Sequence, residues 1–226
     1  MNIRDVEVEK LLGGFPSRQR LWSAFLDATQ TRVMAEIGVW KGDFAAEILA
    51  ATTNIELYYM IDPWANLPDW NKPFNVSPEV FDEIYREMEI KTAFAGDKRR
   101  ILRGRTIEVV DTIPDESLDF VYVDGDHTLR GITIDLIKIW PKVKVGGFIG
   151  GDDFTNTPWQ HDIRFEPTLV CPFSVFFAEA MNVPIAALEH GQFLIHKDEH
   201  ADFSFLDTTG IYGDLSLNKM PVTTGS

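Results

Sequence analysis

The chain has 226 residues, of which 45% are hydrophobic and 25% are charged, a balance typical of one globular domain with small additions. A formal net charge of −14 makes nucleic acid and anionic membranes unfavourable partners. The single cysteine, Cys171, excludes an internal disulfide and fits a reducing, cytoplasmic location, and no apolar run is long enough to span a membrane.

The first half of the chain alternates apolar strands with helical stripes. In chain order we expect a helix over 16–26, a strand over 32–37, a helix over 43–51, a strand over 57–61, a long loop over 64–78, a helix over 79–95, a strand over 100–102 and a short helix over 106–111. Long loops in compact domains are often functional, so the loop over 64–78 is a candidate part of a binding site.

The second half continues the alternation and ends in a hairpin. We expect a strand over 118–123, a helix over 128–140, a strand over 148–151 after a glycine turn, a second loop after Asp153, a helix over 173–181, and strands over 184–188 and 192–196. The polar stretch from Asp198 is expected to lack regular structure. The lone Cys171 is expected to be a buried structural thiol.

This order of elements predicts an α/β protein of the Rossmann-like, doubly wound type, with a mostly parallel sheet and an antiparallel C-terminal hairpin strand. We expect a helical lead-in over 1–30, the main domain over 31–200 and a C-terminal tail over 201–226. In such open sheets, ligands bind beyond the carboxyl ends of the strands, so the chemistry is expected there.

The ends of the first two strands indicate a nucleoside-type ligand. The first strand leads into a turn with Gly38 and Gly42 at its ends, which allows the backbone to come close to a ligand but lacks the full dinucleotide fingerprint. The second strand ends at Asp62, whose carboxylate can accept both hydroxyl protons of a ribose. Alternatively, Asp62 is a turn former before Pro63. Together the two features favour a cofactor that contains adenosine.

The ends of two later strands are acidic. Asp124 follows the strand over 118–123, and Asp152 and Asp153 follow the strand over 148–151. Because these strands are expected to be neighbours, the three carboxylates converge and repel one another unless a cation joins them. Oxygen ligands suit Mg²⁺ or another hard divalent ion. The alternative is that these aspartates cap helices and turns.

Two residues beside the acidic group are candidates for a catalytic base. Asp126 and His127 directly follow Asp124 in the sequence, and either could remove a proton from a substrate hydroxyl. The intrinsic pKa of His127 suits that task, whereas that of Asp126 would have to be raised. His127 could instead be a residue at a helix start that bonds to backbone. Asp135, farther along the predicted helix, is expected on the surface.

Four stretches together carry a family resemblance: residues 35–44, 61–64, 119–127 and 146–154. They resemble class I S-adenosylmethionine-dependent methyltransferases related to macrocin and other antibiotic-sugar O-methyltransferases, and more distantly catechol O-methyltransferase. The resemblance covers about residues 30–197. Its most specific part is the element Asp-Gly-Asp-His at 124–127, followed one helix later by the paired aspartates.

The resemblance implies a seven-stranded sheet with an antiparallel last strand, and it implies roles for individual residues. Glu36, Gly38 and Gly42 would border the methionine part of S-adenosylmethionine, Asp62 would bind the ribose, Thr106 would lie near the adenine, Asp124 would lie beside the cofactor, and Asp124, Asp152 and Asp153 would bind Mg²⁺. The base would be Asp126 or His127. Dimers are common among such proteins, so the resemblance allows a homodimer.

The expected activity is the metal-assisted O-methylation of a small hydroxylated molecule. A sugar hydroxyl is the first choice of acceptor, followed by a catechol or another vicinal diol. Trp64, Trp70 and Trp159 lie on the predicted loops and either stack on the acceptor or pack in the core. Two other interpretations remain open at this point: an NAD-dependent oxidoreductase on a Rossmann-like sheet, and a cofactor-binding relative without catalysis.

Overall fold

The computed structural model describes residues 12–212. The two chain ends, 1–11 and 213–226, lie outside the described residues, and with them parts of the predicted N-terminal lead-in and of the C-terminal tail. Within the described part, no helix is long and apolar enough to cross a membrane.

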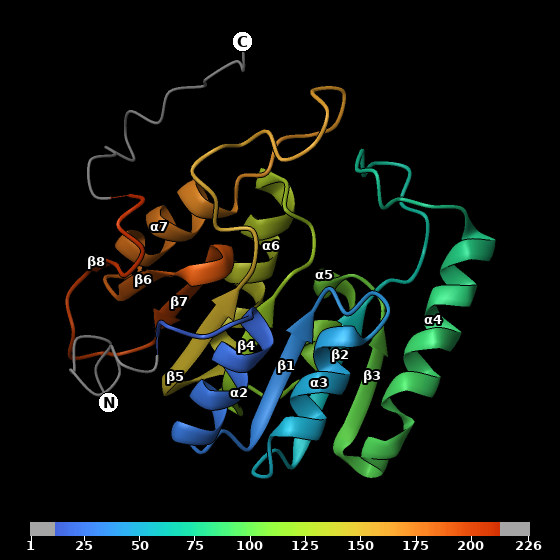
Figure 1. Ribbon diagram of the computed structural model, residues 1–226, viewed down its shortest axis with the longest axis horizontal. Coiled ribbons are helices and arrows are strands. Elements are labelled where there is room, and N and C mark those ends of the chain that lie inside the picture. Colours follow the sequence, from blue (N-terminus) through green and yellow to red (C-terminus); the bar gives the residue numbers. More distant parts are fainter. Residues whose placement is uncertain (1–11, 213–226) are drawn as a thin grey trace.

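One sheet of eight strands organises the molecule, in the order β3-β2-β1-β4-β5-β7-β6-β8 (Figure 1). The strands are β1 (Val33–Ile37), β2 (Leu57–Asp62), β3 (Arg99–Arg103), β4 (Leu118–Val123), β5 (Val143–Gly151), β6 (Pro184–Leu188), β7 (Gln192–His196) and β8 (Ser204–Asp207). β1 to β5 are parallel to one another, and β7 runs antiparallel to both of its neighbours. The predicted doubly wound α/β fold with an antiparallel hairpin is therefore confirmed.

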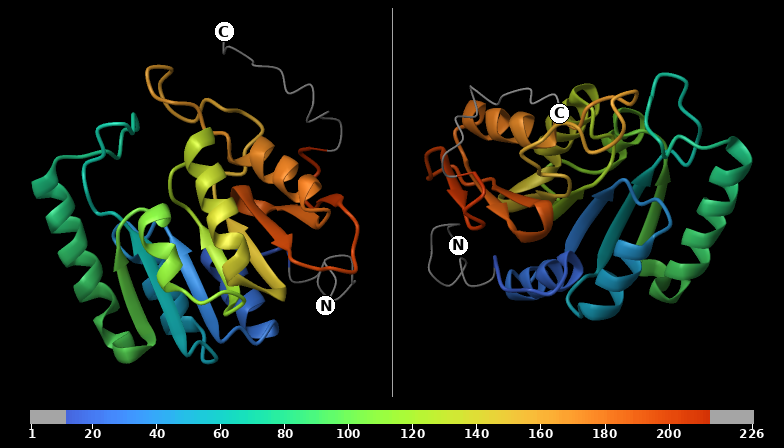
Figure 2. Two further views of the ribbon diagram at one scale, coloured as in Figure 1. Left: turned by 180° about the vertical axis from the view of Figure 1, so that it is seen from behind. Right: turned by 45° about the horizontal axis from the view of Figure 1, so that its top comes forward.

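Helices cover both faces of this sheet, as the two views in Figure 2 show. They are α2 (Arg18–Ala28), α3 (Asp43–Ala51), α4 (Pro78–Thr92), α5 (Thr106–Val109), α6 (Leu129–Ile139) and α7 (Val170–Ala180), with short 3-10 turns η1 (Ala93–Lys98), η2 (Val110–Thr112), η3 (Trp140–Lys142) and η4 (Glu189–Gly191). Apolar side chains of α2, α3 and α4 form one core with the sheet, and those of α6 and α7 form the other.

These cores follow from the apolar periodicity of the helices. On α2, Leu21, Trp22 and Phe25 share one face and are fully buried, and the Trp22 ring packs against Phe120 of β4 at a centroid distance of 5.1 Å. On the other face, Cys171 of α7 is buried as expected, and burial raises the pKa of its thiol to about 12. Both helical layers thus hold the sheet by its buried faces.

Two strands differ from the sequence-based expectation. β8 pairs in parallel with β6 and makes the sheet eight-stranded rather than seven-stranded, although it lies in the polar stretch for which no element was expected. Only four residues long and half-buried, it carries too little apolar signal to be found from sequence. β5 begins earlier than expected, at Val143. The predicted glycine turn lies inside the strand, as a bulge where the register with β4 shifts between Leu118 and Phe120.

Candidate functional site

The carboxyl ends of β1, β2, β4 and β5 open on a cavity of about 630 Å³. All but one of the residues predicted for the site line it. The lining residues include Glu36, Gly38, Asp62, Thr106, Asp124, Asp126, His127, Asp152 and Asp153. Gly42 does not line the cavity; it is the N-cap of α3, between the lining residues Lys41 and Asp43. The structure thus brings the predicted residues together at one edge of the sheet.

The turn after β1 depends on Gly38. Its φ of +88° lies in the left-handed region, and a Cβ there would meet the carbonyl oxygen of Asp124 at 2.0 Å. Only glycine therefore lets the turn after β1 pass against the end of β4. This close approach places Glu36 and Asp124, one from each strand end, on the same cavity.

Glu36 is buried at the end of β1, with 1% of its surface exposed. The hydroxyl of Tyr58 donates a hydrogen bond of 2.7 Å to its Oε2. Burial raises the pKa of Glu36 to about 8, an effect that the Tyr58 hydrogen bond only partly offsets. The raised pKa means that the site favours a positive charge beside this carboxylate. A cationic group of a ligand would therefore be stabilised next to Glu36.

Asp62 joins the end of β2 to the glycine turn. Its two carboxylate oxygens accept hydrogen bonds from the backbone N–H groups of Trp40, at 2.9 Å, and Trp64, at 2.7 Å. Burial raises the pKa of Asp62 to about 6 despite these bonds. Each oxygen retains a further lone pair, so the carboxylate can still accept hydroxyl protons from a ligand in the cavity.

Thr106 at the start of α5 is buried beside a carboxylate that the sequence analysis placed on the surface. Asp135 is only 5% exposed, lines the cavity and has the Thr106 hydroxyl as a hydrogen-bond partner. The expectation of a surface residue is therefore wrong. Position 135 is three residues after Ile132 and four before Ile139, and both are buried on α6. This helical spacing indicates that position 135 lies on the inner face.

The acidic group contains Asp124, His127 and Asp153, whose ligand atoms lie within 4.8 Å of one another. The ring of His127 lies between the two carboxylates: its Nδ1 pairs with Asp153, and its Nε2 is 3.3 Å from an oxygen of Asp124. Among the described residues, Nε2 has no hydrogen bond of good geometry. Burial lowers the pKa of His127, but the neighbouring carboxylates of Asp124 and Asp153 outweigh burial and raise it to about 10.

Asp152 does not belong to this compact group. Its Oδ1 accepts hydrogen bonds from Gln192 Nε2, at 2.6 Å, and from the backbone N–H of Asp153, at 2.8 Å. Its Oδ2 forms an ion pair with Arg18, which also lies 3.1 Å from Asp124. Neither Arg18 nor Gln192 is predicted from the sequence, because neither lies in a strand-end motif that would mark it.

Asp126 occupies a separate position on the loop between β4 and α6. Its Oδ1 accepts hydrogen bonds from the indole N–H of Trp70 and the backbone N–H of Thr128, both at 3.0 Å. A Cβ at Gly131 would meet the Asp126 carboxyl carbon at 2.2 Å, so α6 approaches this side chain as closely as glycine permits. Within residues 12–212, the second oxygen, Oδ2, has only the guanidinium of Arg130 nearby, at 4.0 Å.

Two loops close over the cavity, one after β2 and one after β5. Asn71 on the first loop bonds to Glu166 and to the carbonyl of Arg164 on the second, and Lys72 donates to the carbonyl of Glu166 at 2.7 Å. Of the three tryptophans expected on loops, Trp64 is fully buried, Trp70 lines the cavity, and Trp159 is not among the lining residues. The long loops are thus ordered parts of the site.

A family model described as a methyltransferase domain matches residues 35–154, which include the ends of β1, β2, β4 and β5. No curated protein matches the chain by sequence.

Solved structures with a similar fold share little sequence with this chain. A candidate caffeoyl-CoA O-methyltransferase from Staphylococcus aureus has a TM-score of 0.58 at 13% identity, with 86% of this chain and 89% of that chain covered. The cofactor-bound protein Rv0187 from MTB has a TM-score of 0.58 at 12% identity, with 82% of both chains covered.

A third similar structure is the O-methyltransferase TomG from Streptomyces achromogenes, which is involved in tomaymycin synthesis and was solved in complex with SAM. It has a TM-score of 0.57 at 15% identity, with 83% of this chain and 82% of that chain covered. These three similarities concern the fold.

Proposed function

Because the chain belongs to the methyltransferase-domain family, we propose that it transfers a methyl group from S-adenosylmethionine to a hydroxyl group of a small molecule, with the help of a divalent cation. One observation carries this proposal: a single cavity holds both Asp62, suited to a ribose, and Asp126, suited to accepting a proton. An oxidoreductase that uses NAD has no need of the acidic group, and the family match favours methyl transfer over hydride transfer.

In the proposed complex, the cofactor lies along the ends of β1, β2 and α5. Glu36 and the turn from Gly38 to Gly42 border its methionine part, where a carboxylate can receive the ammonium group. Asp62 accepts the ribose hydroxyl protons, and Thr106 lies beside the adenine. From adenine to methionine, these contacts follow the spatial order of the strands across the sheet. Asp124 lies next to the reactive sulfonium.

The donor set at the cavity edge fits a hard divalent cation. The carboxylates of Asp124 and Asp153 lie together, and the buried Nε2 of His127 lacks a hydrogen-bond partner of good geometry among the described residues. Asp124, Asp152 and Asp153 would hold such an ion, with His127 beside them. When bound, it would lower the pKa of a substrate hydroxyl.

Asp126 is the better placed of the two candidate bases. The bonds from Trp70 and Thr128 both go to its Oδ1, so its Oδ2 accepts no hydrogen bond from residues 12–212. His127, in contrast, has its Nδ1 occupied by Asp153 and its Nε2 directed at Asp124. In the proposed reaction, Asp126 takes the hydroxyl proton, the oxygen forms a bond to the methyl carbon, the carbon–sulfur bond breaks, and S-adenosylhomocysteine leaves.

The decisive experiment measures the transfer of a labelled methyl group to candidate acceptors. The purified chain is incubated with methyl-labelled S-adenosylmethionine and a panel of sugars, catechols and amines, with and without a chelator. We expect label on a hydroxyl-bearing acceptor and its loss on chelation. A chain that labels only amines, or none of the acceptors, would contradict O-methyl transfer, and full activity in chelator would contradict the role of the cation.

Asp126→Asn tests the base within the same assay. The asparagine oxygen can still accept from Trp70 and Thr128, so we expect kcat to fall by about 10²–10⁴-fold while affinity for S-adenosylhomocysteine stays unchanged. The matched control is Asp111→Asn, at a carboxylate that is 78% exposed and absent from the cavity lining. Unchanged kcat in Asp126→Asn, together with a large loss in His127→Gln, would assign the base to His127 instead.

A further inference from the structure

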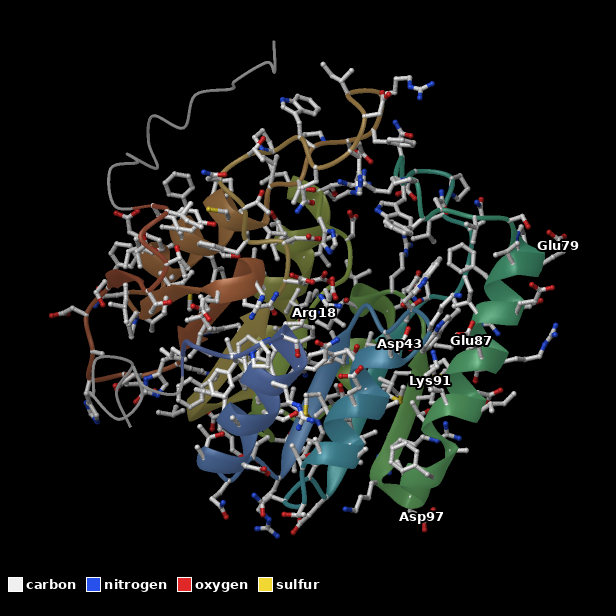
Figure 3. All side chains as sticks on the ribbon, viewed as in Figure 1. Arg18, Asp43, Glu79, Glu87, Lys91 and Asp97 are labelled. Carbon is white, nitrogen blue, oxygen red and sulfur yellow. The ribbon has the colours of Figure 1, made fainter. Side chains whose placement is uncertain are left out.

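A guanidinium group from outside the methyl-transfer motifs occupies the acidic edge of the cavity. Arg18 is the first residue of α2 and lies beside the carboxyl ends of the central strands (Figure 3). Its Nη1 pairs with Asp152, lies 3.1 Å from Asp124 and donates to the Tyr122 hydroxyl at 3.4 Å. Arg18 thus joins Asp124 at the end of β4 to Asp152 at the end of β5, two carboxylates that repel each other.

The position of Asp152 is fixed by a chain of oriented hydrogen bonds. The indole N–H of Trp22 donates to Gln192 Oε1 at 2.7 Å, and the hydroxyl of Tyr122 donates to the same oxygen at 2.9 Å. Two donors on Oε1 force the amide nitrogen of Gln192 toward Asp152, where it donates at 2.6 Å. Asp152 Oδ1 is therefore held by Gln192, and only Oδ2 remains for a cation.

That remaining oxygen is the one that Arg18 holds. Asp152 cannot give Oδ2 to a divalent ion and keep its ion pair with Arg18, because two positive charges would then share one carboxylate oxygen at contact distance. At Asp124 the two oxygens are divided: Arg18 contacts Oδ2, and Oδ1 faces His127. Arg18 and a divalent cation are thus alternatives at Asp152, and at Asp124 the positive charge of Arg18 opposes a cation bound through the other oxygen.

We propose that Arg18 is a built-in counter-ion of the acidic edge, which holds Asp124 and Asp152 when no divalent cation is bound and competes with the cation for them. This inference rests on the metal-assisted part of the proposed function. It makes α2 part of the metal site: a bound cation releases Arg18, which then offers its positive charge to an anionic group of the acceptor or cofactor in the same cavity. The affinity for the cation is therefore lower than the carboxylates alone would give.

The test measures cation binding directly, with Mn²⁺ as the probe. Free Mn²⁺ is quantified by electron paramagnetic resonance during titration of the wild-type chain and of Arg18→Gln, Arg18→Lys and Arg20→Gln. Arg20 lies on the same helix, is exposed and is absent from the cavity lining, so its variant is the control for a simple loss of charge. Binding of S-adenosylhomocysteine is measured in parallel to verify that each variant is folded.

In Arg18→Gln we expect Mn²⁺ affinity to rise by at least about tenfold, because the competing charge is gone, with little change in Arg20→Gln. Arg18→Lys should lie between, since lysine keeps the charge but loses the planar fork. In chelator, Arg18→Gln should melt at a lower temperature than wild type, and Mn²⁺ should raise its melting temperature more than that of wild type.

Two results would overturn the inference, and they differ in what else they imply. If Arg18→Gln and wild type bind Mn²⁺ equally well, or the variant binds it more weakly, Arg18 does not compete and the proposed cation site stands. If neither protein binds Mn²⁺ while both bind S-adenosylhomocysteine, Arg18 is a permanent counter-ion and the metal part of the proposed function falls as well.

Discussion

The carboxyl group of Asp135 illustrates how burial changes the chemistry of a residue. It is 5% exposed on the inner face of α6, and burial raises its pKa to about 7, against the hydrogen bond from Thr106. Because the folded protein binds this proton more tightly than the unfolded chain does, the protonated group adds stability. That contribution is complete below the ordinary pKa of 3.8 and is lost as the pH rises through about 7.

Asp135→Asn keeps the shape of the neutral side chain and removes its titration. We therefore expect the wild type to lose stability relative to the variant between pH 4 and pH 8, by on the order of 3 kcal/mol. Urea unfolding of both proteins at the two pH values, without cofactor, measures the difference. A gap between the two proteins that does not change with pH would show that Asp135 is ionised in the folded protein at low cost.

The acidic residues at the strand ends were predictable, whereas their pairing was not. Parallel strands end at the same edge of a sheet, so Asp124, Asp152 and Asp153 were expected to converge, and the structure brings them to one cavity. No sequence pattern shows which of these aspartates pairs with which cationic residue. That pairing depends on His127, within the motif, and on Arg18, more than 100 residues away from Asp124.

At the scale of elements, the two loops over the cavity act as one unit. Lys72 is 6% exposed, and its ammonium donates to the carbonyl of Glu166 at 2.7 Å and faces the Thr168 hydroxyl at 3.4 Å. Because this buried lysine donates its hydrogen bonds to the opposite loop, it cross-links the two loops. The loops therefore set the shape of the acceptor side of the cavity.

Lys72→Met tests this cross-link, because methionine retains the apolar stem and loses the donors. We expect the KM for the acceptor to rise by roughly tenfold, since a looser pair of loops positions the acceptor less well. Affinity for S-adenosylhomocysteine should stay the same, because the proposed cofactor side lies at the strand ends. Steady-state kinetics with Lys98→Met as an exposed control measures the effect, and a loss confined to cofactor affinity would contradict it.

Element boundaries show where sequence reasoning works and where it does not. The helices and strands with strong apolar periodicity, such as β4 and α6, lie where they were expected. β8 and the bulged first part of β5 were missed, because a four-residue strand and a strand that contains Gly146 and Gly147 have no clear pattern of two-residue alternation. Their pairing partners, rather than their own residues, make them strands.

At the scale of the whole molecule, ion pairs connect helices that lie beside the cavity. The ammonium of Lys91 on α4 lies 2.5 Å from Asp43 of α3 and 3.2 Å from Glu87 (Figure 3). α4 follows the first loop over the cavity, and α3 follows the glycine turn. Exposed ion pairs of this kind contribute modestly to stability, so the two apolar cores carry most of it.

The fold could be predicted from sequence because alternation of elements, connection rules and strand-end chemistry all point to the same topology. The contribution of α2 to the site could not, because no rule of spacing links a helix before the first strand to the ends of β4 and β5. Trp22 shows this: its indole reaches Gln192, 170 residues farther along the chain, and the contact exists only once the sheet has formed.

The most direct test of the account is calorimetric titration of S-adenosylhomocysteine into the wild type and Asp62→Asn, with Asp82→Asn on the exposed face of α4 as control. We predict binding of one ligand per wild-type chain, unchanged binding in the control, and affinity at least about tenfold weaker in Asp62→Asn, because an amide cannot accept both ribose hydroxyl protons. Absence of binding to the wild type, or equal binding to folded Asp62→Asn, would contradict the placement of the cofactor at the ends of β1 and β2.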